Sequence, residues 1–338
     1  MDNKHVITGF LEGRGEYDYQ AGANSPIKRV ILKDNANWKE IKVDNEIQVE
    51  NYGQTTQYDT LMCVSFNGTT DAIEYLMTHQ LKTGLIPRWK AEWLDNNGYI
   101  KNGQLNFNER FTAIMGETTD QGAYQHKVAD GMRKYGLIPQ GMFPMAENFK
   151  DNIDKKFVTQ AMYDLGKKFT ELFKINYEWI TPDMTQEFLK YSPLACFGKY
   201  GNISEGEPLD PQNGSNHSML QVAETSTYRE IDDSYWEQFK KYKKTALQGF
   251  MAFYVDSSDN TMFNPQDFIK THDKFIVRNT HTGSYGVIYQ GTPMLIEQDR
   301  AGLFVIDRDV RGLLGKGHEY SVSLTDQEFS MLDWSRKF

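Results

Sequence analysis

The sequence predicts an α+β fold, with helices in the first half of the chain and strands in the second. Three observations support this class. Apolar residues recur with helical spacing after residue 65 and again over residues 154–174. Past Pro193 the pattern changes to short runs rich in β-branched and aromatic residues. A block of helices followed by a block of strands is typical of α+β proteins.

The bulk composition indicates a globular protein and excludes several function classes. The chain has 338 residues, 39% of them hydrophobic, which is enough for a sizeable core. The net charge of −9 argues against a nucleic-acid partner. No run of about 18 apolar residues is present, so we expect no membrane span. The N-terminus has no signal-peptide pattern and two cysteines make no disulfide framework, so a cytoplasmic location is expected.

The helices are predicted from apolar periodicity and from their end signals. The first follows Cys63, and its apolar face comprises Phe66, Ile73, Leu76, Met77 and Leu81. Gly68 interrupts this pattern, and Gly84 ends it. Residues 86–110 are expected to be loop-like. A short helix ends at Gly136, a second covers 154–174, and a third begins at Thr181, a favourable N-cap.

The strands divide between a larger and a smaller domain. Candidate strands lie at 29–32, 41–43, 194–198, 217–223, 227–231 and 249–255. Residues 256–264 are expected to be a linker, followed by a β meander with strands at 274–279, 284–291, 293–297 and 302–307. The predicted organisation is therefore an N-terminal arm over residues 1–44, a main domain over 45–255 and a small, mainly β domain over 256–338.

Cys63 is the candidate nucleophile. A cysteine nucleophile needs a stabilised thiolate, a histidine base and oxyanion donors, and a third group orients the histidine. Cys63 lies at a loop-to-helix junction, where the helix dipole favours a thiolate. Its backbone N–H and the Gln57 side chain are the candidate oxyanion donors. His217 opens an apolar strand, and a strand pair would bring Asp233, sixteen residues later, back beside it.

Two segments resemble those that carry the catalytic residues of papain-like cysteine proteases. NYGQTTQYDTLMCVSFNGTTDAIEYL has a Gln six residues before the Cys and then a helix, as the family's nucleophile segment does. NHSMLQVAETSTYREIDDSY resembles the family's histidine segment, with Asp233 at the position of the usual Asn. The likeness runs from about residue 45 to about 255. Val64 and Tyr235 replace tryptophans of the family, and the cysteines of its disulfides are absent.

The resemblance implies a papain-like fold, in which a helical lobe with a central nucleophile helix faces an antiparallel β lobe. It implies that Cys63 is the nucleophile, His217 the base and acid, Asp233 the orienting residue and Gln57 an oxyanion donor. Gly122 loosely matches the backbone that binds extended substrate. The expected substrate is a protein or a cell-wall peptide. The chain is most similar to bacterial and bacteriophage members, which places it in a host cytoplasm or a virion.

Other interpretations stay open. A Cys-His-Asp arrangement also fits a transglutaminase-like acyltransferase. The chain also fits a structural component of a phage virion or other assembly, because a lone cysteine at a helix start is often a buried hydrophobe. Asn279 is a rival to Asp233, and Cys196 is expected to be a core residue. The histidines show no metal-binding spacing, so neither a metal nor another cofactor is expected.

Overall fold

The computed structural model divides into two compact units, Met1–Ser258 and Asp259–Phe338. The described residues of the first unit are 10–15, 18–21, 25–41, 60–199, 215–234 and 239–257. Those of the second are 269, 274–279, 285–289, 292–296, 321–324, 326–334 and 336–337. Helices and sheets are mixed, consistent with the predicted α+β class. The predicted N-terminal arm, residues 1–44, belongs to the first unit.

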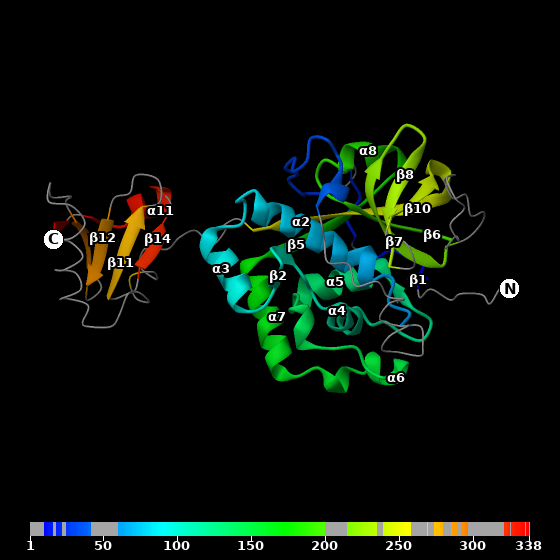
Figure 1. Cartoon of the computed structure of the whole chain (residues 1–338), viewed down its shortest axis with the longest axis horizontal. Coiled ribbons are helices and arrows are strands. Elements are labelled where there is room, and N and C mark those ends of the chain that lie inside the picture. The colour runs from blue at the N-terminus through cyan, green and yellow to red at the C-terminus, as the bar shows by residue number, and fades with distance from the viewer. Residues whose placement is uncertain are drawn as a thin grey trace. The chain divides into compact units, whose positions relative to one another are not determined.

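A six-stranded antiparallel sheet forms the β part of the first unit (Figure 1). The strand order is β5-β10-β6-β7-β8-β9. The bounds are β5 Lys174–Ile180, β6 Leu194–Gly198, β7 His217–Glu224, β8 Tyr228–Asp232, β9 Phe239–Lys243 and β10 Leu247–Asp256. The four strands predicted between residues 194 and 255 are thereby confirmed. β5 was not predicted, although its buried Ile175, Tyr177 and Trp179 alternate with polar residues.

The helix predicted after Cys63 is present as α2, Asp71–Lys82, and a π-helical segment, η2 Phe66–Thr70, precedes it. The helix ends before Gly84, whose φ of +73° is the left-handed conformation that closes many helices. Its predicted apolar face is buried at Ile73, Leu76 and Met77. α2 packs against β10, so the segment that begins near Cys63 lies along the sheet (Figure 1).

The remaining helices of the first unit confirm part of the prediction and correct another part. Their bounds are α3 Arg88–Asn96, α4 Glu109–Met115, α5 Gln125–Tyr135, α6 Phe149–Asn152, α7 Gln160–Leu172 and α8 Thr185–Phe188. Short 3-10 turns are η1 Trp38–Glu40, η3 Gln140–Met142, η4 Lys155–Phe157, η5 Pro182–Met184 and η6 Lys244–Ala246. Residues 86–110 are not a loop, because α3 and the hairpin of β2 Ile100–Lys101 and β3 Gln104–Leu105 lie there. α5 ends at Gly136, as predicted.

The described part of residues 1–44 packs onto the first unit. Trp38 is fully buried, and its indole N–H donates to the carbonyl of Leu189 at 2.7 Å. β1, Phe10–Leu11, pairs in parallel with β4, Ala123–Tyr124. Residues 29–32 are not a strand, which corrects the prediction. Of the strand predicted at 41–43, residues 42 and 43 lie outside the described residues.

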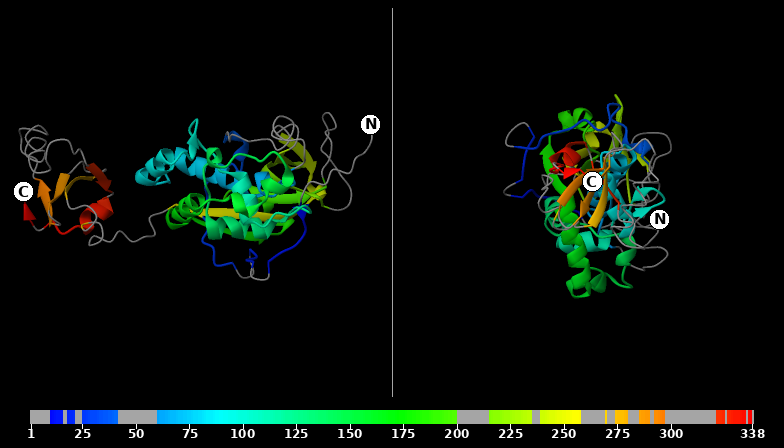
Figure 2. Two further views of the ribbon diagram at one scale, coloured as in Figure 1. Left: turned by 90° about the horizontal axis from the view of Figure 1, so that it is seen from below. Right: turned by 90° about the vertical axis from the view of Figure 1, so that its left-hand side faces the viewer.

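The second unit contains a β-sheet, which Figure 2 shows from two further sides. The sheet has five strands in the order β14-β11-β12-β13-β15. The bounds are β11 Lys274–Asn279, β12 Tyr285–Tyr289, β13 Thr292–Ile296, β14 Ser321–Leu324 and β15 Arg336–Lys337, with one helix, α11 Asp326–Met331. The three central strands form the predicted antiparallel meander. β14 and β15 pair in parallel at its edges. The strand predicted at 302–307 lies outside the described residues.

Candidate active site

The structure places His217 and Asp233 in direct contact. His217 is the first residue of β7, and Asp233 follows the last residue of β8, the neighbouring antiparallel strand. The hairpin returns the chain so that His217 Nε2 and Asp233 Oδ1 lie 2.8 Å apart, with both side chains buried. The predicted juxtaposition is therefore observed at hydrogen-bonding distance.

Lys240 on β9 joins this pair to form a buried triple of side chains, His217–Asp233–Lys240. Its ammonium lies 2.8 Å from Asp233 Oδ2, the oxygen that does not face His217. Burial alone would raise the pKa of Asp233, but His217 and Lys240 outweigh it, so the pKa lies below its ordinary value. Asp233 is thus ionised and can accept hydrogen bonds but not donate them. Because Asp233 only accepts, His217 Nε2 donates in this contact, and in the neutral imidazole Nδ1 is the nitrogen that could act as a base.

Cys63 lies in the turn that leads into η2, which matches the predicted loop-to-helix junction. Its carbonyl accepts the Gly68 N–H at 3.3 Å, the i to i+5 bond that gives η2 its π-helical winding. The positive end of this helical segment therefore lies next to Cys63 and favours an anion there. The side chain is buried.

Gln125 connects the start of the Cys63 helix to the His217 strand. Its side-chain amide donates to the carbonyl of Gly68 in η2, and its oxygen accepts from Ser218 Oγ at 2.7 Å. Ser218 immediately follows His217. A Cβ atom on Gly68 would collide with Ser218 Oγ, so Gly68 is required for the close approach of η2 to β7. No spacing along the sequence indicates Gln125, and from the sequence alone Gly68 resembles a defect in the helix.

A second connection joins α2 to the strand that ends beside Asp233. Asp232 Oδ2 accepts from the Tyr75 hydroxyl at 2.6 Å, and Asp232 Oδ1 accepts from Asn67 Nδ2 at 3.4 Å. Burial, followed by the Asp232 carboxylate, raises the pKa of Tyr75 well above its ordinary value, so Tyr75 remains a donor. The contacts of Gln125 and the Tyr75–Asp232 contact thus form two polar clamps. They hold η2 and α2, the helical segments that follow Cys63, to the hairpin of His217 and Asp233.

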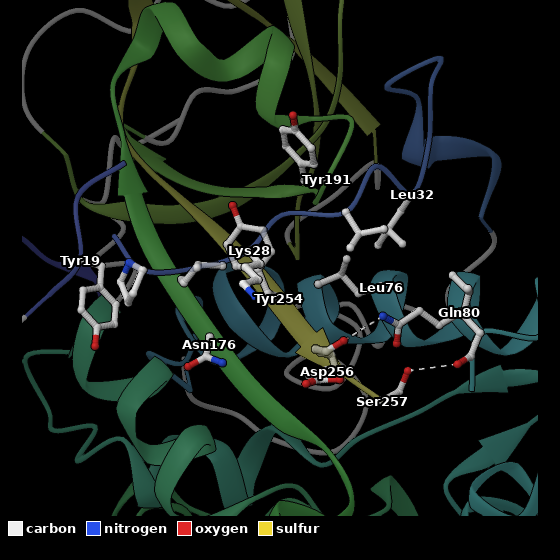
Figure 3. Close-up of a pocket in the computed structure, with 15 residues that line it drawn as sticks. Tyr19, Lys28, Leu32, Leu76, Gln80, Asn176, Tyr191, Tyr254, Asp256 and Ser257 are labelled. Atoms are coloured by element: carbon white, nitrogen blue, oxygen red, sulfur yellow. Dashed lines mark hydrogen bonds between the residues drawn. The ribbon is translucent and has the colours of Figure 1, made fainter. Parts of the chain in front are cut away.

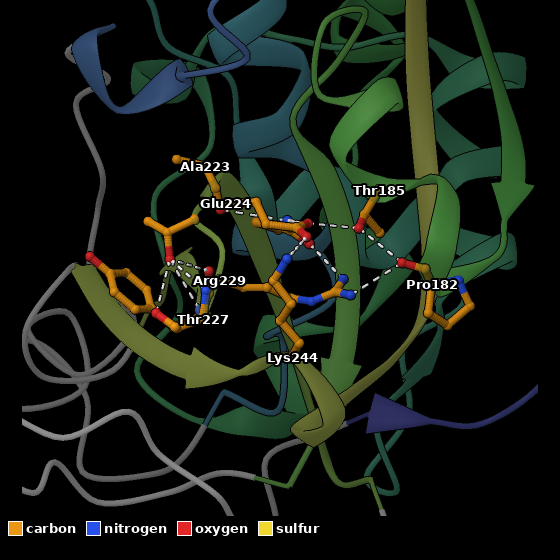
Figure 4. A network of polar contacts seen from close by, with 10 residues as sticks. Pro182, Thr185, Ala223, Glu224, Thr227, Arg229 and Lys244 are labelled. Atoms are coloured by element: carbon orange, nitrogen blue, oxygen red, sulfur yellow. Dashed lines mark hydrogen bonds and ion pairs between the residues drawn. The ribbon is translucent and has the colours of Figure 1, made fainter.

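The far end of the same hairpin is held by a separate polar network (Figure 4). The Arg229 guanidinium donates to Gln221 Oε1 at 3.1 Å and to the carbonyl of Pro182 at 3.2 Å. Glu224 accepts from Thr185 Oγ1 at 2.7 Å. Because β7 and β8 are anchored at this end, His217 and Asp233 at the other end sit on a rigid scaffold.

The remaining predicted site residues are placed differently. Gln57 lies outside the described residues. Gly122 is buried in a tight turn with a φ of +100°, and its N–H and carbonyl both bond to Thr119 at 2.9 Å. Pairing of Gly122 with a substrate backbone would therefore require this turn to open. Asn279 ends β11 in the second unit, whereas His217 Nε2 is already engaged by Asp233.

Cys196 differs from Cys63 in its surroundings. It lies in the middle of β6 and is fully buried, as predicted for a core residue. Burial raises the pKa of its thiol to about 12. Cys196 is therefore a thiol at neutral pH and serves as an internal reference for the reactivity of Cys63.

A cavity of about 570 Å³ opens at the other end of α2 (Figure 3). Leu76 and Gln80 line it from α2, and Tyr254 and Asp256 line it from β10. Gln80 is nine residues beyond Asp71, the first residue of α2, which is roughly 14 Å along the helix axis. The lining includes none of the predicted site residues, and Cys63, His217 and Asp233 are each 0% exposed.

No protein-family model matches the chain, and no curated protein matches it. No cluster of three or more metal-ligating side chains occurs among the described residues. None of the helices in the described ranges has the length and apolar character that a membrane span requires.

Proposed function

We propose that the chain is a papain-like cysteine peptidase or amide hydrolase. One observation carries the proposal: a buried His217–Asp233 pair lies at the end of a strand that packs against η2, the helical segment that begins just after Cys63. This arrangement supplies a base, its orienting carboxylate and a helix start that favours a thiolate. The substrate class is a protein or a cell-wall peptide, and the expected location is a host cytoplasm or a virion.

In the proposed mechanism, the Cys63 thiolate attacks an amide carbonyl and forms a C–S bond. The backbone N–H of Cys63 and the Gln57 side chain bind the oxyanion. The His217 imidazolium gives its proton to the leaving amine as the C–N bond breaks. Neutral His217 then takes a proton from water as the water oxygen attacks the thioester. The C–S bond breaks, the carboxylic acid leaves, and the Cys63 thiolate and the His217 imidazolium are restored. Asp233 keeps the imidazole oriented throughout.

The test compares cleavage of casein and of peptidoglycan by the wild type, Cys63→Ala and Cys196→Ala. The proposal predicts cleavage of one substrate by the wild type, loss of at least about 10³-fold in Cys63→Ala, and retained activity in Cys196→Ala. Equal activity of the Cys63→Ala variant and the wild type would refute the nucleophile assignment.

A second candidate is a structural component of a virion or other assembly that uses the same fold as a scaffold. The observation that favours it is the burial of Cys63 and His217, because a nucleophile must be reached by its substrate. Slow and sub-stoichiometric alkylation of Cys63 at neutral pH, without cleavage of either substrate, would favour this candidate over the peptidase.

A transglutaminase-like acyltransferase is a third candidate, favoured by the ionised Asp233 beside His217. It shares the acyl-enzyme step and differs in the acceptor, which is an amine instead of water. Incorporation of a fluorescent amine into casein, dependent on Cys63, would identify it. Peptide cleavage without amine incorporation would exclude it.

A further inference from the structure

Lys240 is a charged side chain in an unusually buried position. It lies on β9 with its side chain 1% exposed, and its ammonium contacts the buried carboxylate of Asp233. Lysine is almost never fully buried without a partner, because removing its charge from water is costly. Lys240 and His217 bind different oxygens of the same carboxylate, so the three side chains form one chain of contacts, His217–Asp233–Lys240.

The proposed chemistry needs His217 to change its charge during each cycle. It must be an imidazolium when it protonates the leaving amine, and neutral when it activates water. A buried carboxylate at 2.8 Å with no counter-charge would strongly favour the imidazolium and hinder the second step. A cation on the far oxygen of the carboxylate offsets this preference for the imidazolium form.

Among the described residues, other titratable groups lie on the elements that pack near the triple. Cys63 precedes η2, which packs on β6 and β7, and Cys196 lies on β6. Asp232 precedes Asp233 and is bound to Tyr75 of α2. Among these, Lys240 is the group that makes a direct ionic contact with Asp233 on the side away from His217.

We propose that Lys240 is a positioning residue, which fixes the Asp233 carboxylate and balances its charge so that Asp233 orients His217 without holding it permanently protonated. The inference rests on the proposed function for its catalytic meaning. With Lys240 present, Asp233 presents one oxygen to the histidine and behaves electrostatically like the neutral Asn of the papain-like proteases that the sequence resembles.

The test follows the ring protons of His217 by NMR as a function of pH, with a His217→Gln variant to assign the signals. Three variants are compared with the wild type: Lys240→Met, Asp233→Asn and the double variant. We expect the midpoint of His217 to rise by about one pH unit in Lys240→Met, where the Asp233 carboxylate loses the Lys240 cation. The midpoint should fall in Asp233→Asn, where the Lys240 cation stays and the carboxylate is lost, and it should return close to the wild-type value in the double variant.

The double variant also keeps the test valid if a single variant unfolds, because it removes both buried charges together. A midpoint in the double variant close to that of Asp233→Asn, or an unchanged midpoint in Lys240→Met, would overturn the proposal, since Lys240 would then be only structural.

A parallel activity measurement separates this inference from the proposed function. If the chain is a peptidase, the alkaline limb of its kcat/KM profile should move to higher pH in Lys240→Met by the same amount as the His217 midpoint. A shifted NMR midpoint with no cleavage by the wild type would retain the charge-balancing role and reject the peptidase. Cleavage by the wild type together with an unshifted His217 midpoint in Lys240→Met would retain the peptidase and reject the charge-balancing role.

Discussion

Gly68 and Ser218 approach so closely that a single added methyl group on the glycine would collide with the serine hydroxyl. Gly68 belongs to the helical segment that begins just after Cys63, and Ser218 follows His217. The contact therefore sets how near the helical segment after Cys63 comes to the strand that begins with His217. Gln125 bonds to both residues and holds them together.

Gly68→Ala should push η2 away from β7. We expect a loss of about 1–3 kcal/mol in the free energy of unfolding, measured with urea, because the tightly packed interface cannot absorb the methyl group. Alkylation of Cys63 and any cleavage activity should change in the same variant. Gly141→Ala is the matched control, since a Cβ there meets nothing within 4 Å, and it should be close to neutral.

Tyr75→Phe should weaken the clamp between α2 and β8. The change removes the hydroxyl that donates to the buried Asp232 carboxylate at 2.6 Å, and the expected cost in unfolding free energy is about 1–3 kcal/mol. Tyr191→Phe removes a hydroxyl that contacts Glu187 at the surface, and it should stay within about 0.5 kcal/mol of the wild type. Equal effects of the two changes would contradict the clamp.

Acid should remove the stability that the buried Asp233 contributes. Because its folded pKa is lowered, the ionised carboxylate stabilises the fold above the unfolded value of about 3.9, and the contribution disappears as the pH falls through the folded pKa. Urea midpoints measured from pH 7 downwards should therefore fall less steeply below about pH 4 in Asp233→Asn/Lys240→Met than in the wild type. Parallel curves of urea midpoint against pH for the two proteins would show that the Asp233–Lys240 pair does not make stability depend on pH in this range.

The sequence predicts the contact between His217 and Asp233 because spacing along a hairpin is a local property. Sixteen residues containing two strands and a short turn suffice to return Asp233 to His217. Lys240 was missed because FKKYK resembles a solvated charged edge strand. In the structure this segment alternates, with Lys240 and the aromatic Tyr242 both buried. A period-two interpretation anchored on Tyr242 would have placed Lys240 inside.

The long-range contacts of the site could not be predicted from the sequence. Gln125 is 57 residues from Gly68 and 93 from Ser218, and no periodicity relates them. The close approach of η2 to β7 turns Gly68 from an apparent flaw into a requirement. The parallel pairing of β1 with β4 likewise depends on tertiary packing, because two-residue strands carry no pattern of their own.

The rate of Cys63 alkylation by iodoacetamide from pH 4 to 9, measured in a Cys196→Ala background, tests whether His217 activates Cys63 as we propose. We expect stoichiometric labelling with a midpoint well below the ordinary thiol pKa of about 8.5, and a return towards that value when His217→Ala is added. Slow, sub-stoichiometric labelling at neutral pH that His217→Ala leaves unchanged would show that His217 does not activate Cys63.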